Sequence, residues 1–341
     1  MILLRSIQLK DLEQVNELTN IPGFLTLKGD TDGLRSLIKL SIKSFNGDAP
    51  EREKAKFIFV VEDTEADRVI GVSMIAAKHG TLDNPHFYFQ LDVEERHSKT
   101  IDKTFSHRTL KLEFDVDGPS EIGGLVVHPD YRQDHRKIGR QISFARFLYL
   151  SLNPNKFENQ IIAELLPPLD SDRKAPLWEA VGRRFTEMDY WEANDLCETN
   201  KEFIFSLFPL EKIYVTLLSG EAQVSIGDVG SETKSAFHML KKIGFKYRDQ
   251  VDPFDGGPHL WAEVSDIECV KKCKNYVISD VSDNSTSLEV GLLMKSGAEG
   301  GFLALQGEVL KSGNSLKITD SKIKNYLGLV DGDAVTFMPY Y

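Results

Sequence analysis

Short apolar runs dominate the first part of the chain. Residues 56–77 form two such runs around a polar turn and predict a β-hairpin, and residues 109–116 alternate apolar and polar positions as a half-buried strand does. Residues 31–45 carry apolar side chains at helical spacing, and so do the residues that follow Gly139. The segment from Glu94 to Arg108 is polar and predicts an excursion from this pattern. Strands mixed with helices predict an α+β fold with a mixed sheet.

The pattern changes twice further along the chain. Residues 170–270 are mainly typical of helices, and from about residue 275 short β-rich runs alternate with Gly-Ser-Asn turns. A chain of 341 residues is long enough for two or three domains. We therefore expect an N-terminal domain over residues 1–168, a second α/β unit over 169–272 and a small β-rich module over 273–341.

Composition excludes several classes of protein. The net charge of −11 argues against a nucleic-acid-binding protein, because phosphate backbones require a basic surface. No apolar run approaches the ~20 residues that cross a bilayer, and the first residues lack the features of a signal peptide. We therefore expect a cytoplasmic protein that does not contact the membrane. Cys197, Cys269 and Cys273 have no zinc-binding spacing, so free thiols and no metal site are expected.

A basic loop interrupts this acidic chain at residues 124–140, G-L-V-V-H-P-D-Y-R-Q-D-H-R-K-I-G-R. An apolar strand precedes the loop and a helical pattern follows it. The first backbone N–H groups of a helix lack partners and its dipole favours anions, so such a loop can bind phosphate. The chain has neither a dinucleotide-binding nor a P-loop glycine pattern. On the residues alone, a phosphate-bearing ligand and a solvated basic turn both stay open.

Longer motifs resemble one family. S-E-I-x-x-L-V-V-H-P-D-Y-R (120–132), I-I-A-E-L (161–165), A-P-L-W-E-A-V-G-R-R-F (175–185) and G-F-K-Y-x-x-x-V-D-P-F-D-G-G-P (244–258) resemble, in this order, the motifs of bacterial arginine N-succinyltransferases. Those enzymes belong to the acyl-CoA N-acyltransferase (GNAT) superfamily. The resemblance extends over essentially the whole chain and implies two GNAT-like α/β units followed by the β-rich module.

The resemblance implies an enzyme that transfers the succinyl group of succinyl-CoA to the α-amine of arginine, in arginine degradation, without a permanently bound cofactor. The strand at 122–127 would pair with the pantetheine, and one of its backbone N–H groups would stabilise the oxyanion. Leu125 matches the position that contacts succinyl-CoA in the family. The residues expected to bind coenzyme A are Leu125, Val126, Val127, Arg132, Arg136, Lys137, Gly139 and Arg140.

Four carboxylates are candidates for the rest of the chemistry. Glu121 and Glu164 are candidates for proton transfer, and burial on an apolar strand is expected to raise the pKa of Glu164. Asp252 and Asp255 suit a guanidinium, for which a carboxylate is the natural partner. Structural roles are the alternatives: Glu164 paired with an arginine, and the two aspartates capping a turn.

Three positions depart from the family pattern. Gly230 stands where the family has the histidine assigned as proton donor, and Val116 stands where it has a second histidine. Lys137 stands where the phosphate loop has its first glycine. Three interpretations follow: an arginine N-succinyltransferase that uses another group, an acyltransferase for a different amine or acyl donor, or a homologue or partner subunit that binds acyl-CoA without turnover. The family also suggests a dimer or a hetero-oligomer with a related subunit.

Overall fold

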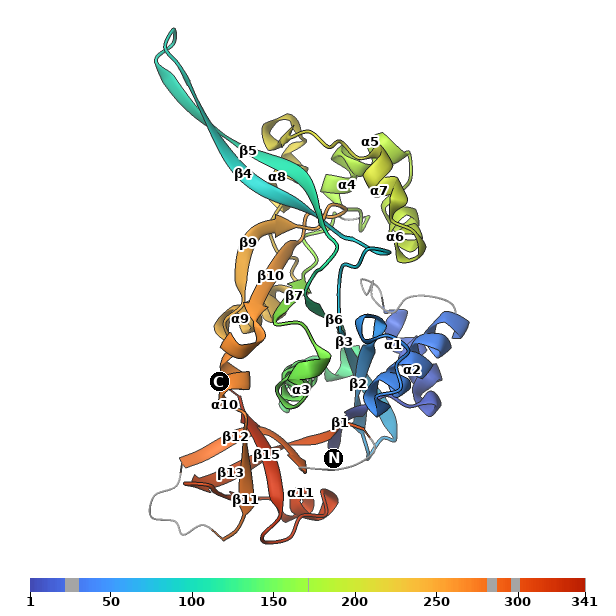
Figure 1. Cartoon of the computed structure of the whole chain (residues 1–341), viewed down its shortest axis with the longest axis vertical. Helices are drawn as coiled ribbons and strands as arrows, with labels where there is room; N and C mark the ends of the chain where they lie inside the picture. Colours follow the sequence, from blue (N-terminus) through green and yellow to red (C-terminus); the bar gives the residue numbers. More distant parts are fainter. Residues whose placement is uncertain (22–30, 171, 281–286, 296–300, 341) are drawn as a thin grey trace. The chain divides into compact units, whose positions relative to one another are not determined.

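The computed structural model describes residues 1–21, 31–170, 172–280, 287–295 and 301–340 (Figure 1). The chain forms two compact units, each assembled from separated stretches. Unit 1 comprises Met1–Lys78, Ser120–Asn159 and Glu263–Tyr341, and unit 2 comprises His79–Pro119 and Gln160–Ala262. The predicted domains, by contrast, are three consecutive segments of the sequence with boundaries after residues 168 and 272. That three-part division stays a prediction.

Four antiparallel strands form the N-terminal part of unit 1, in the order β1 (Ile2–Ser6), β2 (Lys56–Asp63), β3 (Arg68–Ala76) and β6 (Ser120–Val127). The predicted hairpin of residues 56–77 is thereby confirmed. Both faces of β2 and β3 are buried, which explains why their sequences are almost continuously apolar.

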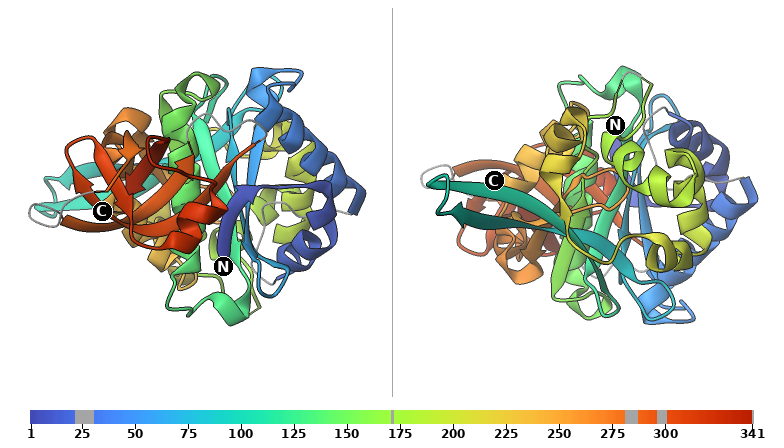
Figure 2. Two further views of the ribbon diagram at one scale, coloured as in Figure 1. Left: turned by 90° about the horizontal axis from the view of Figure 1, so that it is seen from below. Right: turned by 90° about the horizontal axis from the view of Figure 1, so that it is seen from above.

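Helices cover both faces of these strands (Figure 2). Helices α1 (Leu12–Thr19) and α2 (Thr31–Asn46) share a core with alternate residues of β2, among them Ile58 and Val60. Helix α3 (Ile138–Leu152) covers the other face, where Tyr149 contacts the rings of Phe57 and Phe59. This division follows from the twofold alternation of side chains along a strand.

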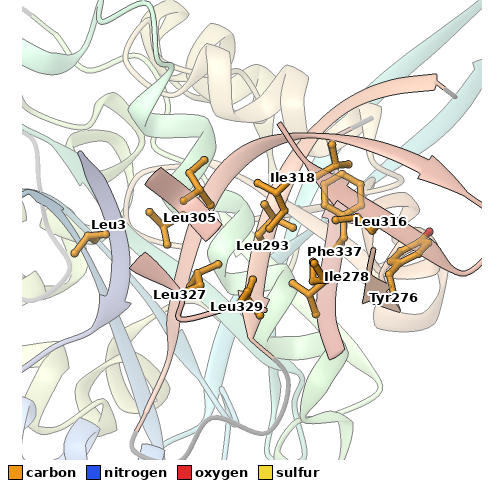
Figure 3. Close-up of a cluster of buried hydrophobic side chains, with 13 residues drawn as sticks. Leu3, Tyr276, Ile278, Leu293, Leu305, Leu316, Ile318, Leu327, Leu329 and Phe337 are labelled. Carbon is orange, nitrogen blue, oxygen red and sulfur yellow. The ribbon is translucent and has the colours of Figure 1, made fainter. Parts of the chain in front are cut away.

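The C-terminal part of unit 1 is a β-rich module with a compact apolar core (Figure 3). Strand β13 pairs antiparallel with β1, opposing Ala304 to Leu4, so the module extends the same unit rather than standing apart. The module also contains a short helix, α11 (Ser321–Tyr326). The other elements are α10 (Glu268–Lys272), β11 (Lys274–Ile278), β12 (Ser287–Lys295), β13 (Leu303–Ser312), β14 (Ser315–Ile318) and β15 (Ala334–Pro339).

Unit 2 contains six strands in the order β7, β10, β9, β4, β5, β8. The polar excursion predicted for residues 94–108 is the outer part of the long β4–β5 hairpin, where exposed side chains remove the hydrophobic signal of a strand (Figure 1). The strands are β4 (His86–Ser98), β5 (Lys103–Asp115), β7 (Gln160–Glu164), β8 (Ile213–Tyr214), β9 (Lys246–Val251) and β10 (Pro258–Glu263). The helices are α4 (Pro176–Ala180), α5 (Gly182–Thr186), α6 (Tyr190–Thr199), α7 (Glu202–Leu207), α8 (Gly220–Ser225) and α9 (Lys234–Lys242).

Strands and helices together confirm the predicted α+β class. Within the described part of the chain, every helix is too short or too polar to traverse a bilayer.

Candidate functional site

Strand β6 contains a β-bulge at the position predicted to bind the acyl group. Val126 opposes Val72 and Gly123 opposes Met74, so two residues of β6, Gly124 and Leu125, lie opposite the single residue between Val72 and Met74 on β3. Gly124 has a φ of 58°, a left-handed conformation that glycine adopts readily. A bulge removes one residue from the ladder of strand hydrogen bonds, so backbone N–H and C=O groups become accessible to a ligand.

The basic loop leads directly from β6 to the first turn of α3. Arg132 is exposed, and its Nε donates to the carbonyl of Val127 at 3.2 Å. Lys137 is also exposed and has a φ of 56°. The loop therefore keeps the left-handed backbone that a glycine would favour here, although a lysine occupies the position.

Arg136 is occupied by carboxylates of the same unit. Its Nη2 lies 2.6 Å from Asp134 Oδ2 and 3.7 Å from Asp63 Oδ2. Hydrogen bonds from Arg136 lower the pKa of Asp134 to about 2. These contacts give Arg136 a structural role in shaping the loop.

Two further arginines lie on α3. The guanidinium of Arg140 stacks on the Tyr340 ring, 4.2 Å from its centroid. Arg146 is only 4% exposed, and its Nη2 donates to Ser143 Oγ at 2.7 Å while Nη1 donates to the Gly123 carbonyl at 3.4 Å. Among the described residues no carboxylate forms an ion pair with Arg146, and burial lowers its pKa to about 9. A buried cation without an anion is costly, so Arg146 marks a place for an anionic ligand.

Glu164, the last residue of β7, lies among three histidines of unit 2. Its Oε1 is 3.2 Å from Nε2 of His86, 3.3 Å from Nε2 of His79 and 3.7 Å from Nε2 of His259. Burial works against the anion, but the imidazoles outweigh it and hold the pKa of Glu164 well below its usual range. The expected rise in this pKa is therefore wrong, and the expected arginine partner is replaced by histidines.

Asp252 and Asp255 build the turn between β9 and β10. Asp252 Oδ1 accepts the amide N–H groups of Phe254 and Asp255, at 2.7 and 3.0 Å. Asp255 Oδ1 accepts from the Gly257 amide, and its Oδ2 accepts from the Tyr190 hydroxyl. The turn-capping role is thus present, and binding of a guanidinium stays a prediction.

The backbone of Gly230 packs against the residues that follow β7. Its N–H donates to the Leu166 carbonyl at 2.9 Å, and a Cβ added to Gly230 would lie 2.7 Å from the Pro167 carbonyl oxygen. The backbone therefore leaves no room for a side chain at Gly230, the position that the resemblance matches to the family's histidine.

A family model described as "Arginine N-succinyltransferase beta subunit" matches residues 2–269. The chain belongs to the arginine N-succinyltransferase family. The arginine N-succinyltransferase of Photorhabdus laumondii is 32% identical over 344 residues, which cover 100% of this chain and 99% of that protein, and the one of Citrobacter koseri is 32% identical over 277 residues, 80% and 79% of the two chains. The solved structure of arginine/ornithine succinyltransferase subunit AI from Pseudomonas aeruginosa matches with a TM-score of 0.81 at 26% identity, covering 100% of this chain and 99% of that one. The predicted acyltransferase fold and family are confirmed.

Within this succinyltransferase-family chain, the predicted coenzyme-binding residues gather on β6, the basic loop and the first turn of α3, all in unit 1, where Glu121 lies on β6 opposite Ala76. Glu164, Asp252 and Asp255 lie in unit 2. Arg146 was expected as one of the cations that contact the phosphates, but its burial beside the bulge was not. Sequence reasoning missed the histidines around Glu164, because they are scattered along the sequence and gave no signal.

Proposed function

We propose that this chain catalyses transfer of the succinyl group of succinyl-CoA to the α-amine of arginine. The observation that carries the proposal is the bulge at Gly124–Leu125, which runs into the basic loop and α3 of a chain that belongs to this family. In the reaction the amine nitrogen forms a bond to the thioester carbon, the C–S bond breaks, the amine loses a proton and the thiolate gains one. A backbone N–H at the bulge would stabilise the oxyanion that forms between these steps.

Coenzyme A would be bound through its phosphates at the loop. The first turn of α3 offers backbone N–H groups beside Gly139, and the exposed side chains of Arg132 and Lys137 add positive charge. Arg136 would act on the coenzyme only by shaping the loop, because Asp134 holds its guanidinium.

The free carboxylate of the succinyl group would pair with Arg146. Nη1 of Arg146 donates to the carbonyl of Gly123, the residue directly before the bulge, so the cation lies next to the expected place of the thioester. The free carboxylate of a succinyl group would then be the anionic partner of Arg146, which none of the described residues provides. An acetyl group has no carboxylate to offer.

The amine would be recognised in unit 2. Asp252 is the candidate for the guanidinium of arginine, and burial together with the charge of Glu164 raises its pKa to about 6. A bound guanidinium would favour the ionised form of this carboxylate. Glu121 stays the candidate proton acceptor in unit 1. We also propose that the enzyme works as an oligomer in the cytoplasm, as a homodimer or with a related subunit, which light scattering of the purified protein would test.

Thiol release tests the activity. Succinyl-CoA and acetyl-CoA are each offered with arginine, ornithine and other amino acids, and we expect release only with succinyl-CoA and with arginine as the best amine. No thiol release with any pair overturns the proposal, and coenzyme A binding without release would identify a homologue that binds but does not turn over.

A separate variant tests the succinyl contact. Arg146→Lys keeps a buried cation but loses the planar fork, so we expect the preference for succinyl-CoA over acetyl-CoA to fall by about tenfold or more. An unchanged preference in a folded Arg146→Lys protein contradicts the assignment of Arg146 while leaving the activity itself intact.

A further inference from the structure

Three histidines and two carboxylates of unit 2 meet although they are distant in sequence. They come from the segment before β4, the start of β4, the end of β7, the turn after β9, and β10. The residues are His79, His86, Glu164, Asp252 and His259. We name them the histidine cluster. His86 is 2% exposed and His259 is fully buried, so both rings lie out of contact with bulk water.

The distances among His79, His86 and Glu164 fit ligands around one ion. The Nε2 atoms of His79 and His86 lie 3.3 and 3.2 Å from Glu164 Oε1, and that of His259 lies 3.7 Å from it. In tetrahedral coordination with metal–nitrogen and metal–oxygen bonds of about 2.0–2.1 Å, neighbouring ligand atoms lie about 3.4 Å apart. The polar atoms of His79, His86 and Glu164 lie within 4.8 Å of one another, whereas Asp252 and His259 form a second group with Glu164.

Hydrogen bonding alone explains these distances less well. A charge-assisted N–H···O bond to a carboxylate is usually about 2.7–2.9 Å long, shorter than all three contacts. Three donors on one carboxylate oxygen also exceed its two lone pairs. The ring centroids of His79 and His86 are only 4.4 Å apart. Two protonated imidazoles at this distance would repel each other.

We propose that the histidine cluster binds one divalent transition-metal ion, with Zn²⁺ as the expected ion. The Nε2 atoms of His79 and His86 and the carboxylate of Glu164 are the ligands. Imidazole ligands select zinc and its neighbours, whereas Mg²⁺ and Ca²⁺ prefer oxygen. The ion would hold the segment before β4, the start of β4 and the end of β7 together, and this role does not depend on succinyl transfer.

The test uses the full chain without a polyhistidine tag, freed of metal by a chelator and titrated with Zn²⁺. We expect one equivalent to bind and a thermal midpoint about 5 °C higher when the free ion exceeds its Kd about a hundredfold. His79→Gln and His86→Gln should each weaken binding by about a hundredfold or more. His97→Gln and His238→Gln, at exposed histidines of the same unit, are the matched controls and should bind as the unchanged protein does.

Co²⁺ gives a readout that does not depend on the variants folding. In the unchanged protein it should show the intense visible bands of tetrahedral nitrogen and oxygen coordination, without the near-ultraviolet band of a thiolate ligand. Binding of less than a tenth of an equivalent of Zn²⁺ by the unchanged protein overturns the proposal. Equal affinity in the His86→Gln and His97→Gln proteins, or a thiolate band, overturns it as well, and none of these results bears on the transferase activity.

Discussion

Gly230 is the position that the resemblance matches to the family's histidine, and Gly230→Ala tests whether it has room for a side chain. The added Cβ would meet the Pro167 carbonyl oxygen at 2.7 Å and the Leu166 carbonyl oxygen at 3.3 Å, both backbone atoms that cannot rotate away. Overpacking of this kind typically costs about 1–3 kcal/mol. Gly230 is not in the left-handed region, so its backbone conformation is also accessible to alanine. Alanine lowers the conformational entropy of the unfolded chain, and this stabilises the fold by about 0.4–1 kcal/mol.

The net expectation is a loss of about 1–2 kcal/mol in the free energy of unfolding. This corresponds to a thermal midpoint lower by about 2–8 °C. Gly220→Ala is the matched control, because a Cβ added at the start of α8 meets nothing within 4 Å. The control should be as stable as the unchanged protein or slightly more stable.

Thermal unfolding followed by circular dichroism measures both variants. If Gly230→Ala unfolds at the same temperature as Gly220→Ala or above it, the position is open and our account of the missing side chain is wrong. Gly230→His, which restores the family residue, should be less stable still and should not raise the rate of thiol release.

Three further variants test the coenzyme loop and its strand. Lys137→Gly relieves the left-handed strain and should stabilise the protein by about 1 kcal/mol in urea unfolding while raising the KM for succinyl-CoA, and an unchanged KM would remove Lys137 from the binding site. Arg136 lowers the pKa of Asp134 to about 2, so the ionised Asp134 stabilises the fold by at most about 2 kcal/mol above pH 4, and this stabilisation is lost as the pH falls towards 2. The difference in free energy of unfolding between the unchanged protein and Asp134→Asn should therefore shrink between pH 5 and pH 3. A constant difference would contradict the ion pair. Gly124→Val places a β-branched residue at a φ of 58° and should lower kcat by about a hundredfold or more in the thiol assay, so an active variant would argue against the bulge as the oxyanion site.

Local sequence was sufficient to predict the strand, loop and helix that carry the coenzyme site. Apolar alternation, the charge of the loop and helical spacing all lie within residues 120–152, so no long-range contact was needed. A count of positive charge along the loop does not reveal that the carboxylate of Asp134, two residues earlier, binds Arg136. Coenzyme A binding by Arg136 stays a prediction.

Long-range contacts set the limits of the prediction. The pKa of Glu164 is lowered rather than raised because His79, His86 and His259 surround it. These histidines are up to 180 positions apart in the sequence (79 against 259), so no local pattern predicts that they meet. The polar outer part of the β4–β5 hairpin carried no strand signal, because exposed strands are not required to alternate. The interleaving of the two units likewise follows from tertiary pairing, as between β1 and β13.

The closed position at Gly230 bears on how the reaction is catalysed. A general acid typically contributes about 10²–10⁴-fold to a rate, so its absence alone leaves the larger part of an enzymatic acceleration in place. Oxyanion stabilisation at the bulge and positioning of two bound substrates do not depend on that residue. The reaction also conserves protons overall, since the amine releases one and the thiolate takes one. The bulge at Gly124 and the buried cation of Arg146 are both present in this chain, and we propose that they polarise and select the acyl donor. On this proposal, selection of the donor does not need a histidine at position 230, and a slower but specific succinyltransferase is expected.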